Sequence, residues 1–416
     1  MGPELDRLRE TVAEVEALAR ELGLDWGEVE FELVSPQALA ALSAYGLFPR
    51  FSHWSFGRAC RRLRARQRHG ERFFELVLPT RPVKAYLVAG NPVPSRVAVA
   101  HALAHADFLH HNRHFRTAPP LTPQRLAQHA ILLRGYERRY GLPAVEAVLD
   151  AALTLQSYVH PEGRDDLLEL VVRSAPDLAE WQREVVALVR AESLCLRAVE
   201  LTRLTNEGWA TYWQTWIMRA LPLQPDEIPS WALLQAELLR PRPPAINPYL
   251  VGFRVFQTLA QKEPRERLFR IREEENDASL VERYLTAELV KELDLFVYRA
   301  LGGRWVVTAP AEEAEAVRQA LVRQLGQAGV PALEVVDADY RGRKELYLRH
   351  RYDGRPLVEP SLALTLAHLY SLWGRPVHLE TTTEARLLVY TADRSGVRIS
   401  SARPRPPGGS CRCWRV

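Results

Sequence analysis

Apolar residues recur at helical spacing along most of the first 300 residues, and this pattern predicts a largely helical body. The expected helices are 5–22, 36–44, 57–69, 96–111, 123–140, 143–156, 178–201, 205–220, 230–237, 248–260 and 280–293. Proline stands at or near several of their starts, where its missing N–H is harmless. No internal repeat of fixed period interrupts the series.

Strand-like segments appear in two places. Near the N-terminus, 26–34 predicts a strand, and 73–78 and 83–88 predict two strands around a Thr80-Arg81-Pro82 turn. Beyond Gly302-Gly303 the predicted order is strand, helix, strand, strand, helix, strand, over 305–309, 311–326, 332–338, 345–350, 361–373 and 377–382. This β-α-β-β-α-β order is that of a ferredoxin-like domain.

These patterns predict a fold in three parts. A mainly α N-terminal body with a small β-hairpin occupies residues 1–300. A small α/β ferredoxin-like domain follows over 304–384, and residues 385–416 form a hairpin and a flexible tail. A chain of 416 residues is long enough for two domains.

Composition points to an ordinary soluble globular protein, with 47% hydrophobic and 25% charged residues. The formal net charge of +4 is small for this length and gives no argument for nucleic acid. No apolar stretch approaches the ~20 residues of a membrane span, and the polar N-terminus does not look like a secretory signal. Four cysteines without a disulfide pattern favour a reducing cytoplasm.

The most informative chemistry is the sequence His101-Ala102-Leu103-Ala104-His105. Histidines four residues apart lie on one face of a helix, where both can bind one metal ion. Glu207, in the sequence Asn206-Glu207-Gly208, would add a carboxylate from a second helix with Thr205 as its N-cap. Gly208 would let another helix or a substrate approach closely.

Two histidines and one glutamate leave a coordination position open, which is typical of a catalytic metal, here zinc or another divalent ion. An Asn-Glu-Gly sequence is also how gluzincin peptidases present their third ligand, so a zincin-like site is expected. The base glutamate of the zincin motif H-E-x-x-H is absent, however, because Ala102 stands in its place. The alternative is that the three side chains form a structural polar network.

Other residues are candidates for catalysis or substrate binding. Glu192 is the preferred general base or fourth ligand, and Asp107 is the other acidic candidate, although it points away from His105 on an ideal helix. The substrate pocket is expected to involve His53, Trp54, Trp209 and Asn206.

The same residues carry a resemblance to the SpoVR (stage V sporulation protein R-like) family. The matching segments are Ala44-Tyr45-Gly46, Phe51-Ser52-His53-Trp54-Ser55-Phe56-Gly57, Ala85-Tyr86-Leu87, His101-x-x-x-His105-x-Asp107-Phe108, Tyr136-Glu137, Tyr140-Gly141, Trp181-Gln182, Asn206-Glu207-Gly208-Trp209-Ala210-x-Tyr212-Trp213 and Ile246-Asn247-Pro248-Tyr249. The sequence departs from the family pattern at Gln214, where a histidine is usual, and at His110 and His111, where lysine and asparagine are usual.

The resemblance implies a cytoplasmic protein linked in spore-formers to assembly of the cortex peptidoglycan. It also implies association with a AAA-type serine protein kinase and a von Willebrand-A-like protein. The leading hypothesis is a zinc-dependent hydrolase that cleaves an amide bond in a peptide or peptidoglycan-like substrate. The alternatives are a non-catalytic regulator or scaffold beside the kinase system and, less favoured, a basic protein associated with nucleic acid.

Overall fold

The structure is a computed structural model of the whole chain. It describes residues 3–45, 50–68, 75–88, 92–160, 165–301, 304–326, 328–353, 355–382 and 386–404. The chain forms two compact units, each built from two separate stretches. The first contains residues 1–132 and 195–328, and the second contains 133–194 and 329–416.

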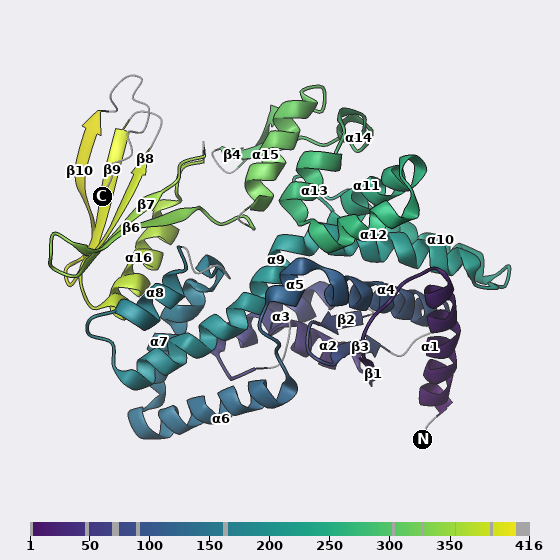
Figure 1. The fold of residues 1–416 in the computed structure, drawn as a ribbon, viewed down its shortest axis with the longest axis horizontal. Coiled ribbons are helices and arrows are strands. Elements are labelled where there is room, and N and C mark those ends of the chain that lie inside the picture. Colours follow the sequence, from purple (N-terminus) through teal and green to yellow (C-terminus); the bar gives the residue numbers. More distant parts are fainter. Residues whose placement is uncertain are drawn as a thin grey trace. The chain divides into compact units, whose positions relative to one another are not determined.

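The first unit is mainly helical (Figure 1). Its helices are α1 (Pro3–Glu21), α2 (Pro36–Ser43), α3 (Trp54–Arg68), α4 (Pro92–His111), α5 (Arg113–Thr117), α10 (Glu227–Leu238), α11 (Pro248–Lys262), α12 (Arg265–Glu274), α13 (Asp277–Tyr284), α14 (Ala287–Glu292) and α15 (Ala314–Gly326). Two further helices, α6 (Pro123–Tyr140) and α9 (Glu180–Ala220), contribute residues to both units.

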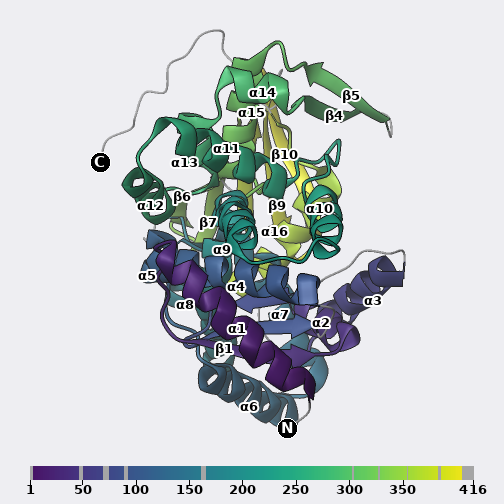
Figure 2. The same ribbon diagram turned by 90° about the vertical axis from the view of Figure 1, so that its right-hand side faces the viewer.

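Helix α4 lies at the centre of the first unit. Its residues from Val97 to Leu103 are buried all round the helix, as expected of a helix inside a core rather than on a surface. It contacts α1, α5, α10 and α12 as well as two strands, and Figure 2 shows α1 lying across it. Alanines at 98, 100, 102, 104 and 106 keep the helix narrow, so its neighbours approach closely.

A three-stranded sheet flanks α4. Strand β3 (Val83–Val88) is central, with β2 (Glu75–Leu78) antiparallel on one side and β1 (Val29–Val34) parallel on the other. The predicted pair of strands is therefore present, and the strand predicted at 26–34 joins it. Both β2 and β3 contact α4, which places Glu75, at the start of β2, on an element beside the histidine-bearing helix.

The second unit is built on a five-stranded sheet in the order β10-β9-β8-β7-β6 (Figure 1). The strands are β6 (Leu333–Tyr340), β7 (Glu345–His350), β8 (Val377–Thr382), β9 (Arg386–Asp393) and β10 (Gly396–Pro404). All neighbours are antiparallel except β7 and β8, which are parallel and connected through α16 (Glu359–Trp373). Helices α7 (Leu142–Thr154) and α8 (Leu167–Ser174) also belong to this unit.

The predicted ferredoxin-like order is not what forms. Strand β5 (Arg304–Ala309), expected as the first strand of that domain, pairs with β4 (Val297–Leu301) in a two-stranded ribbon. Helix α15 packs against α13 and α14 in the first unit. The reason is local: two adjacent glycines between strand-like segments favour a tight hairpin, so β5 pairs with its immediate predecessor. The hairpin predicted near 386–400 is present as β9 and β10, and residues 405–416 of the expected tail lie outside the described residues.

Two helix predictions also differ from the structure. The segments 178–201 and 205–220, expected as separate helices, form one 41-residue helix, α9. The segment 280–293 is divided into α13 and α14, with Thr286 as the N-cap of the second. Of the described helices, none is both long and apolar enough to cross a membrane.

Candidate metal centre

His101 and His105 lie one turn apart on the buried helix α4. Their ring centroids are 4.5 Å apart with the rings nearly perpendicular. His101 is almost fully buried, and His105 is partly buried. The helix thus presents both imidazoles to the same neighbour, as the i, i+4 spacing predicts.

That neighbour is α9, two of whose amides, just before Glu207, bind a carboxylate from outside the helix. The backbone N–H groups of Leu204 and Thr205 donate to the two oxygens of the Asp277 carboxylate, at 2.9 and 2.8 Å. The Thr205 hydroxyl donates to the same carboxylate at 2.9 Å. Amides inside a regular helix donate to the carbonyl four residues earlier, so Asp277 caps the second half of α9 from outside. The prediction that Thr205 is the N-cap of a separate helix was wrong, because α9 continues through Thr205.

Gly208 allows α9 to touch α11. A Cβ atom on Gly208 would lie 2.4 Å from the Cα of Gly252, and one on Gly252 would lie 2.4 Å from the carbonyl oxygen of Leu204. Only two facing glycines permit this approach. The expectation that Gly208 accommodates a neighbouring helix is therefore confirmed.

The three predicted ligands come together. Oε2 of Glu207 lies 3.4 Å from Nε2 of His101 and 3.3 Å from Nε2 of His105. Among the described residues these three form one of two groups of His, Cys, Asp or Glu that are close enough to hold a metal ion. Donors bound at about 2.1 Å around a tetrahedral ion are separated by about 3.4 Å. The spacing therefore fits a single ion.

The other nitrogen of each ring is held by an amide. Nδ1 of His101 lies 2.8 Å from Oε1 of Gln214, and Nδ1 of His105 lies 2.8 Å from Oδ1 of Asn206. An amide oxygen can only accept, so each Nδ1 carries a proton and donates it. In the neutral form, a ring held in this way directs the lone pair of its Nε2 towards Glu207, which is the tautomer a metal ligand requires.

A short relay of hydrogen bonds fixes the orientation of the Gln214 amide. Its NH₂ group donates to Oε1 of Gln235 at 3.1 Å. The Gln235 NH₂ group donates to the hydroxyl of Thr215 at 3.0 Å, and that hydroxyl donates to the carbonyl of Thr211. Because the last acceptor is a carbonyl, the whole relay runs in one direction and leaves the Gln214 oxygen facing His101.

The electrostatics of the group are those of a strongly coupled site. Burial would raise the pKa of Glu207, but the adjacent imidazoles of His101 and His105 hold it well below its usual range. Burial lowers the pKa of His105, and Glu207 outweighs it, so the net shift is upward. Nε2 of His101 and Oε2 of Glu207 are nevertheless buried with no hydrogen-bond partner among the described residues. Buried polar atoms of this kind call for a proton or a cation.

Two residues near the group were not predicted. Burial raises the pKa of Glu75, whose carboxylate also feels the charges of His101, His105 and Glu207. The ring of Tyr249 stacks on His101 at 6.0 Å, and burial followed by the Glu207 charge raises the pKa of its phenol well above the usual value. Tyr249 belongs to the Ile246–Tyr249 motif, so the sequence contained a signal that could have identified it. No sequence motif pointed to Glu75.

Asp107 does not face the metal ligands. It forms a buried ion pair with Arg272 at 2.6 Å, accepts the indole N–H of Trp209 at 2.9 Å and accepts the backbone N–H of Asp25 at 2.9 Å. Its role is to fasten α4 to α12 and to the segment after α1. Trp209 is fully buried in that contact and packs in the core, so its part in a substrate pocket stays a prediction.

Glu192, the preferred base, lies fifteen residues before Glu207 on α9, which corresponds to about 22 Å of helix. The structure therefore does not bring it to the three ligands. Asn206, expected to bind substrate, holds His105 instead. His53 and Trp54 contact each other with ring centroids 5.4 Å apart, and Trp54 is half exposed, so substrate binding by this pair stays a prediction.

Fold and site together define a mainly helical protein with a His–His–Glu group held between two core helices. The chain belongs to the SpoVR-like family: the family described as "SpoVR like protein" matches residues 3–165 and 160–330, and the "SpoVR-like C-terminal domain" matches 331–384. It is similar to the uncharacterized protein YcgB of Escherichia coli K12, with 24% identity over 482 residues that cover 92% of this chain and 94% of the relative. No solved structure matches it significantly.

Proposed function

We propose that the chain is a metal-dependent hydrolase, with zinc as the preferred ion and His101, His105 and Glu207 as its ligands. The observation that carries the proposal is the convergence of two Nε2 atoms on one carboxylate oxygen at 3.3 and 3.4 Å, with both Nδ1 protons committed to amide oxygens. Neutral imidazoles and an ionised carboxylate are the donor set that zinc prefers. A bound divalent ion would supply a water of lowered pKa and polarise a carbonyl group.

The residues around the ligands fit the remaining tasks. Glu75 replaces Glu192 and Asp107 as the candidate general base. Its carboxylate interacts with all three proposed ligands, and burial raises its pKa, which strengthens it as a proton acceptor. Tyr249 keeps its phenolic proton and can donate a hydrogen bond to a developing oxyanion. Gln214 and Asn206 hold the rings in position and exchange no proton themselves.

The substrate class rests on the family rather than on the geometry. SpoVR-like proteins take their name from a stage of sporulation in which the cortex is assembled, so an amide bond in a peptide or peptidoglycan-like molecule is the substrate we propose. The cytoplasm is the proposed location.

The competing function is a regulator or scaffold that works with a AAA-type serine protein kinase and a von Willebrand-A-like protein. In that case a proton replaces the ion, and the upward pKa shift of His105 beside Glu207 is the observation that favours it. A charged imidazole next to a carboxylate would satisfy the same atoms without metal.

Elemental analysis of the full chain, purified without an affinity tag, separates the two functions. The hydrolase proposal expects about one zinc per chain at this site. The His101→Ala, Glu207→Ala double variant should lose this zinc. The control variant His368→Ala, which changes a histidine on α16, should keep it. Hydrolysis of muropeptides and short peptides by the zinc-loaded chain is the second measurement. Absence of metal from the wild type, or metal content unchanged in the double variant, would overturn the proposal.

A further inference from the structure

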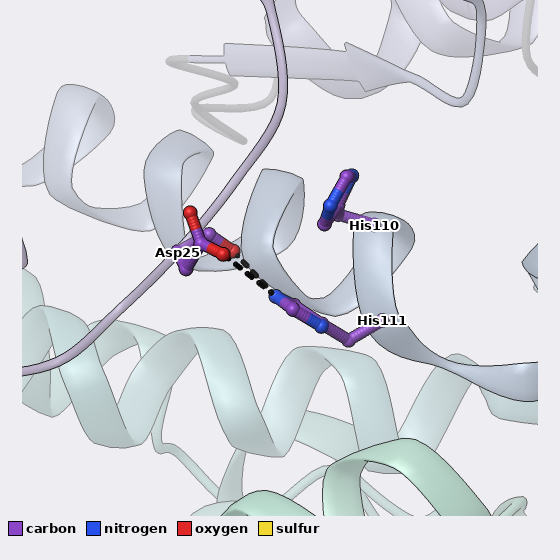
Figure 3. A group of neighbouring side chains, drawn as sticks. All are labelled: Asp25, His110 and His111. Carbon is purple, nitrogen blue, oxygen red and sulfur yellow. Dashed lines mark hydrogen bonds and ion pairs between the residues drawn. The ribbon is translucent and has the colours of Figure 1, made fainter.

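A second group of potential ligands lies at the far end of α4. It consists of His110 and His111, in the last turn of the helix, and Asp25, in the segment between α1 and β1 (Figure 3). One ligand atom from each of the three residues lies within 4.8 Å of the others. His110 and Asp25 are exposed and His111 is partly exposed, whereas in the first group His101 is buried and His105 and Glu207 are partly buried.

The backbone of Asp25 is fixed from two sides. Its N–H donates to the buried Asp107 carboxylate at 2.9 Å, and its carbonyl oxygen accepts from Nε2 of His111 at 2.9 Å. The Asp107 carboxylate is itself anchored by Arg272 and Trp209. Asp25 is therefore held in place by its backbone, while its carboxylate remains free to rotate next to the histidines, with Oδ2 at 3.7 Å from His111.

The two imidazoles are also confined. Their ring centroids are 4.7 Å apart and the rings are nearly perpendicular, in an edge-to-face contact. Gly27 lies directly beside His110, since a Cβ at that position would be 3.2 Å from Nδ1. A side chain larger than hydrogen at Gly27 would push His110 away from Asp25. Figure 3 shows the Asp25 carboxylate and the His111 ring facing each other, with His110 on the same side of the segment.

We infer that Asp25, His110 and His111 form a second, solvent-accessible site for a divalent transition metal, independent of the proposed hydrolase centre. Two imidazoles and a carboxylate suit zinc, nickel or copper(II), with water in the remaining positions. Ligand atoms around one ion lie about 3.4 Å apart, and those of this group lie within 4.8 Å of one another. To bind the ion, the exposed His110 and Asp25 side chains would rotate, and Nε2 of His111 would exchange its hydrogen bond with the Asp25 carbonyl for the metal.

The consequence of binding would be structural. An ion held by Asp25 and the two histidines would fasten the α1–β1 segment to the C-terminal end of α4. Binding to the folded state alone raises stability in proportion to the logarithm of metal concentration over the dissociation constant. The site would therefore act as a metal-dependent clamp on the first unit.

Zinc titration of the full chain, stripped with chelator and free of any tag, tests the inference. The wild type should bind two Zn²⁺ per chain, and both the His101→Ala, His105→Ala variant and the His110→Ala, His111→Ala variant should bind one. Asp25→Asn keeps both backbone contacts, so it should fold normally and weaken only the second site, by about 10-fold or more. The exposed Asp226→Asn serves as the matched control and should bind as the wild type does.

The two sites fail in distinguishable ways. If the His101→Ala, His105→Ala variant binds no zinc at all, the inference of a second site is wrong, whereas the proposal of a hydrolase centre still stands. Unchanged stoichiometry in the His110→Ala, His111→Ala variant would also overturn the second site. Light scattering measures whether zinc changes the mass of the protein in solution. Zinc that binds at the second site only by joining two copies of the chain would contradict a clamp within one copy.

Discussion

Gly208 on α9 and Gly252 on α11 face each other so closely that a Cβ on either would lie within 2.6 Å of the backbone of the other. This contact sits directly beside Glu207 in the sequence. The closest approach of the two helices is therefore made where the carboxylate of the proposed centre must be placed. Two residues without side chains determine how near α11, and Tyr249 with it, can come to the ligands.

Replacing Gly208 with alanine should destabilise the fold by about 1–3 kcal/mol, because the added methyl group meets backbone that cannot rotate away. Gly135 on α6 is the matched control, since nothing lies within 4 Å of its Cβ position. Gly135→Ala should be neutral or stabilising by up to about 1 kcal/mol. Urea unfolding of both variants measures the difference, and equal effects would contradict the close approach.

Replacing Asp277 with alanine should cost about 1–3 kcal/mol, because it leaves the buried N–H groups of Leu204 and Thr205 without an acceptor. It should also lower zinc binding at Glu207, the third residue after Leu204. Asp226 precedes α10 and makes no side-chain capping hydrogen bond, so Asp226→Ala is the control and should be nearly neutral. A stable Asp277→Ala protein would show that α9 does not depend on this cap.

Replacing Gln214 with leucine should weaken zinc binding at the proposed centre by about 10- to 100-fold, the usual effect of removing a partner that orients a metal-bound histidine. The Nδ1 proton of His101 would lose its acceptor. Gln235→Leu removes only the next member of the relay and should have a smaller effect. Isothermal titration with zinc ranks the three proteins, and wild-type affinity in Gln214→Leu would contradict the assigned orientation.

Replacing Glu75 with glutamine should leave zinc content unchanged and reduce hydrolysis by about 10²- to 10⁴-fold, as expected when a general base is removed. Glu30 pairs with Lys84 on β1 and β3 at the surface, and Glu30→Gln is the control. Turnover and metal content are measured on the same samples. Loss of metal together with activity would make Glu75 a ligand instead of a base.

The fold should become less stable in acid in a way that depends on His114. Burial, with the charge of Arg113, lowers its pKa to about 4 from 6.5. The unfolded chain therefore takes up a proton more readily than the folded one, so the contribution of His114 is complete above about pH 6.5 and is lost as the pH falls towards 4. For one proton, the free energy of unfolding falls by at most about 1.4 kcal/mol for each pH unit.

This dependence is measured as the difference in unfolding free energy between the wild type and His114→Asn from pH 7 to pH 4. The variant should show a shallower decline with acid. His368→Asn, which leaves His114 in place, should follow the wild type. Parallel curves for the wild type and His114→Asn would show that His114 is protonated as easily in the folded chain as in the unfolded one.

The convergence of the three proposed ligands could be predicted because their signals are local. The i, i+4 spacing of His101 and His105 places both on one face of any helix, and an Asn-Glu-Gly sequence is short and distinctive. The partners that complete the group could not be predicted in this way. Gln214 was visible only as a departure from the family pattern, and its role as the acceptor for His101 depends on a contact between residues 113 positions apart in the chain.

The errors have the same origin. Thr205 looked like an N-cap because the acceptor that takes that role, Asp277, lies 72 residues further along the chain. Glu192 was chosen as a base from its nearness in sequence to Glu207, although about four turns of α9 separate the two. The ribbon of β4 and β5 is the opposite case, since the Gly302-Gly303 sequence was a hairpin signal that outweighed the apparent ferredoxin-like order.

The cap supplied by Asp277 also makes the centre depend on chain completion. A fragment that ends at residue 262 contains every proposed ligand, yet it lacks the carboxylate that accepts from the Leu204 and Thr205 amides before Glu207. During synthesis the proposed ligands therefore emerge before this support for α9, and the proposed centre would be complete only after α13 has folded onto α9.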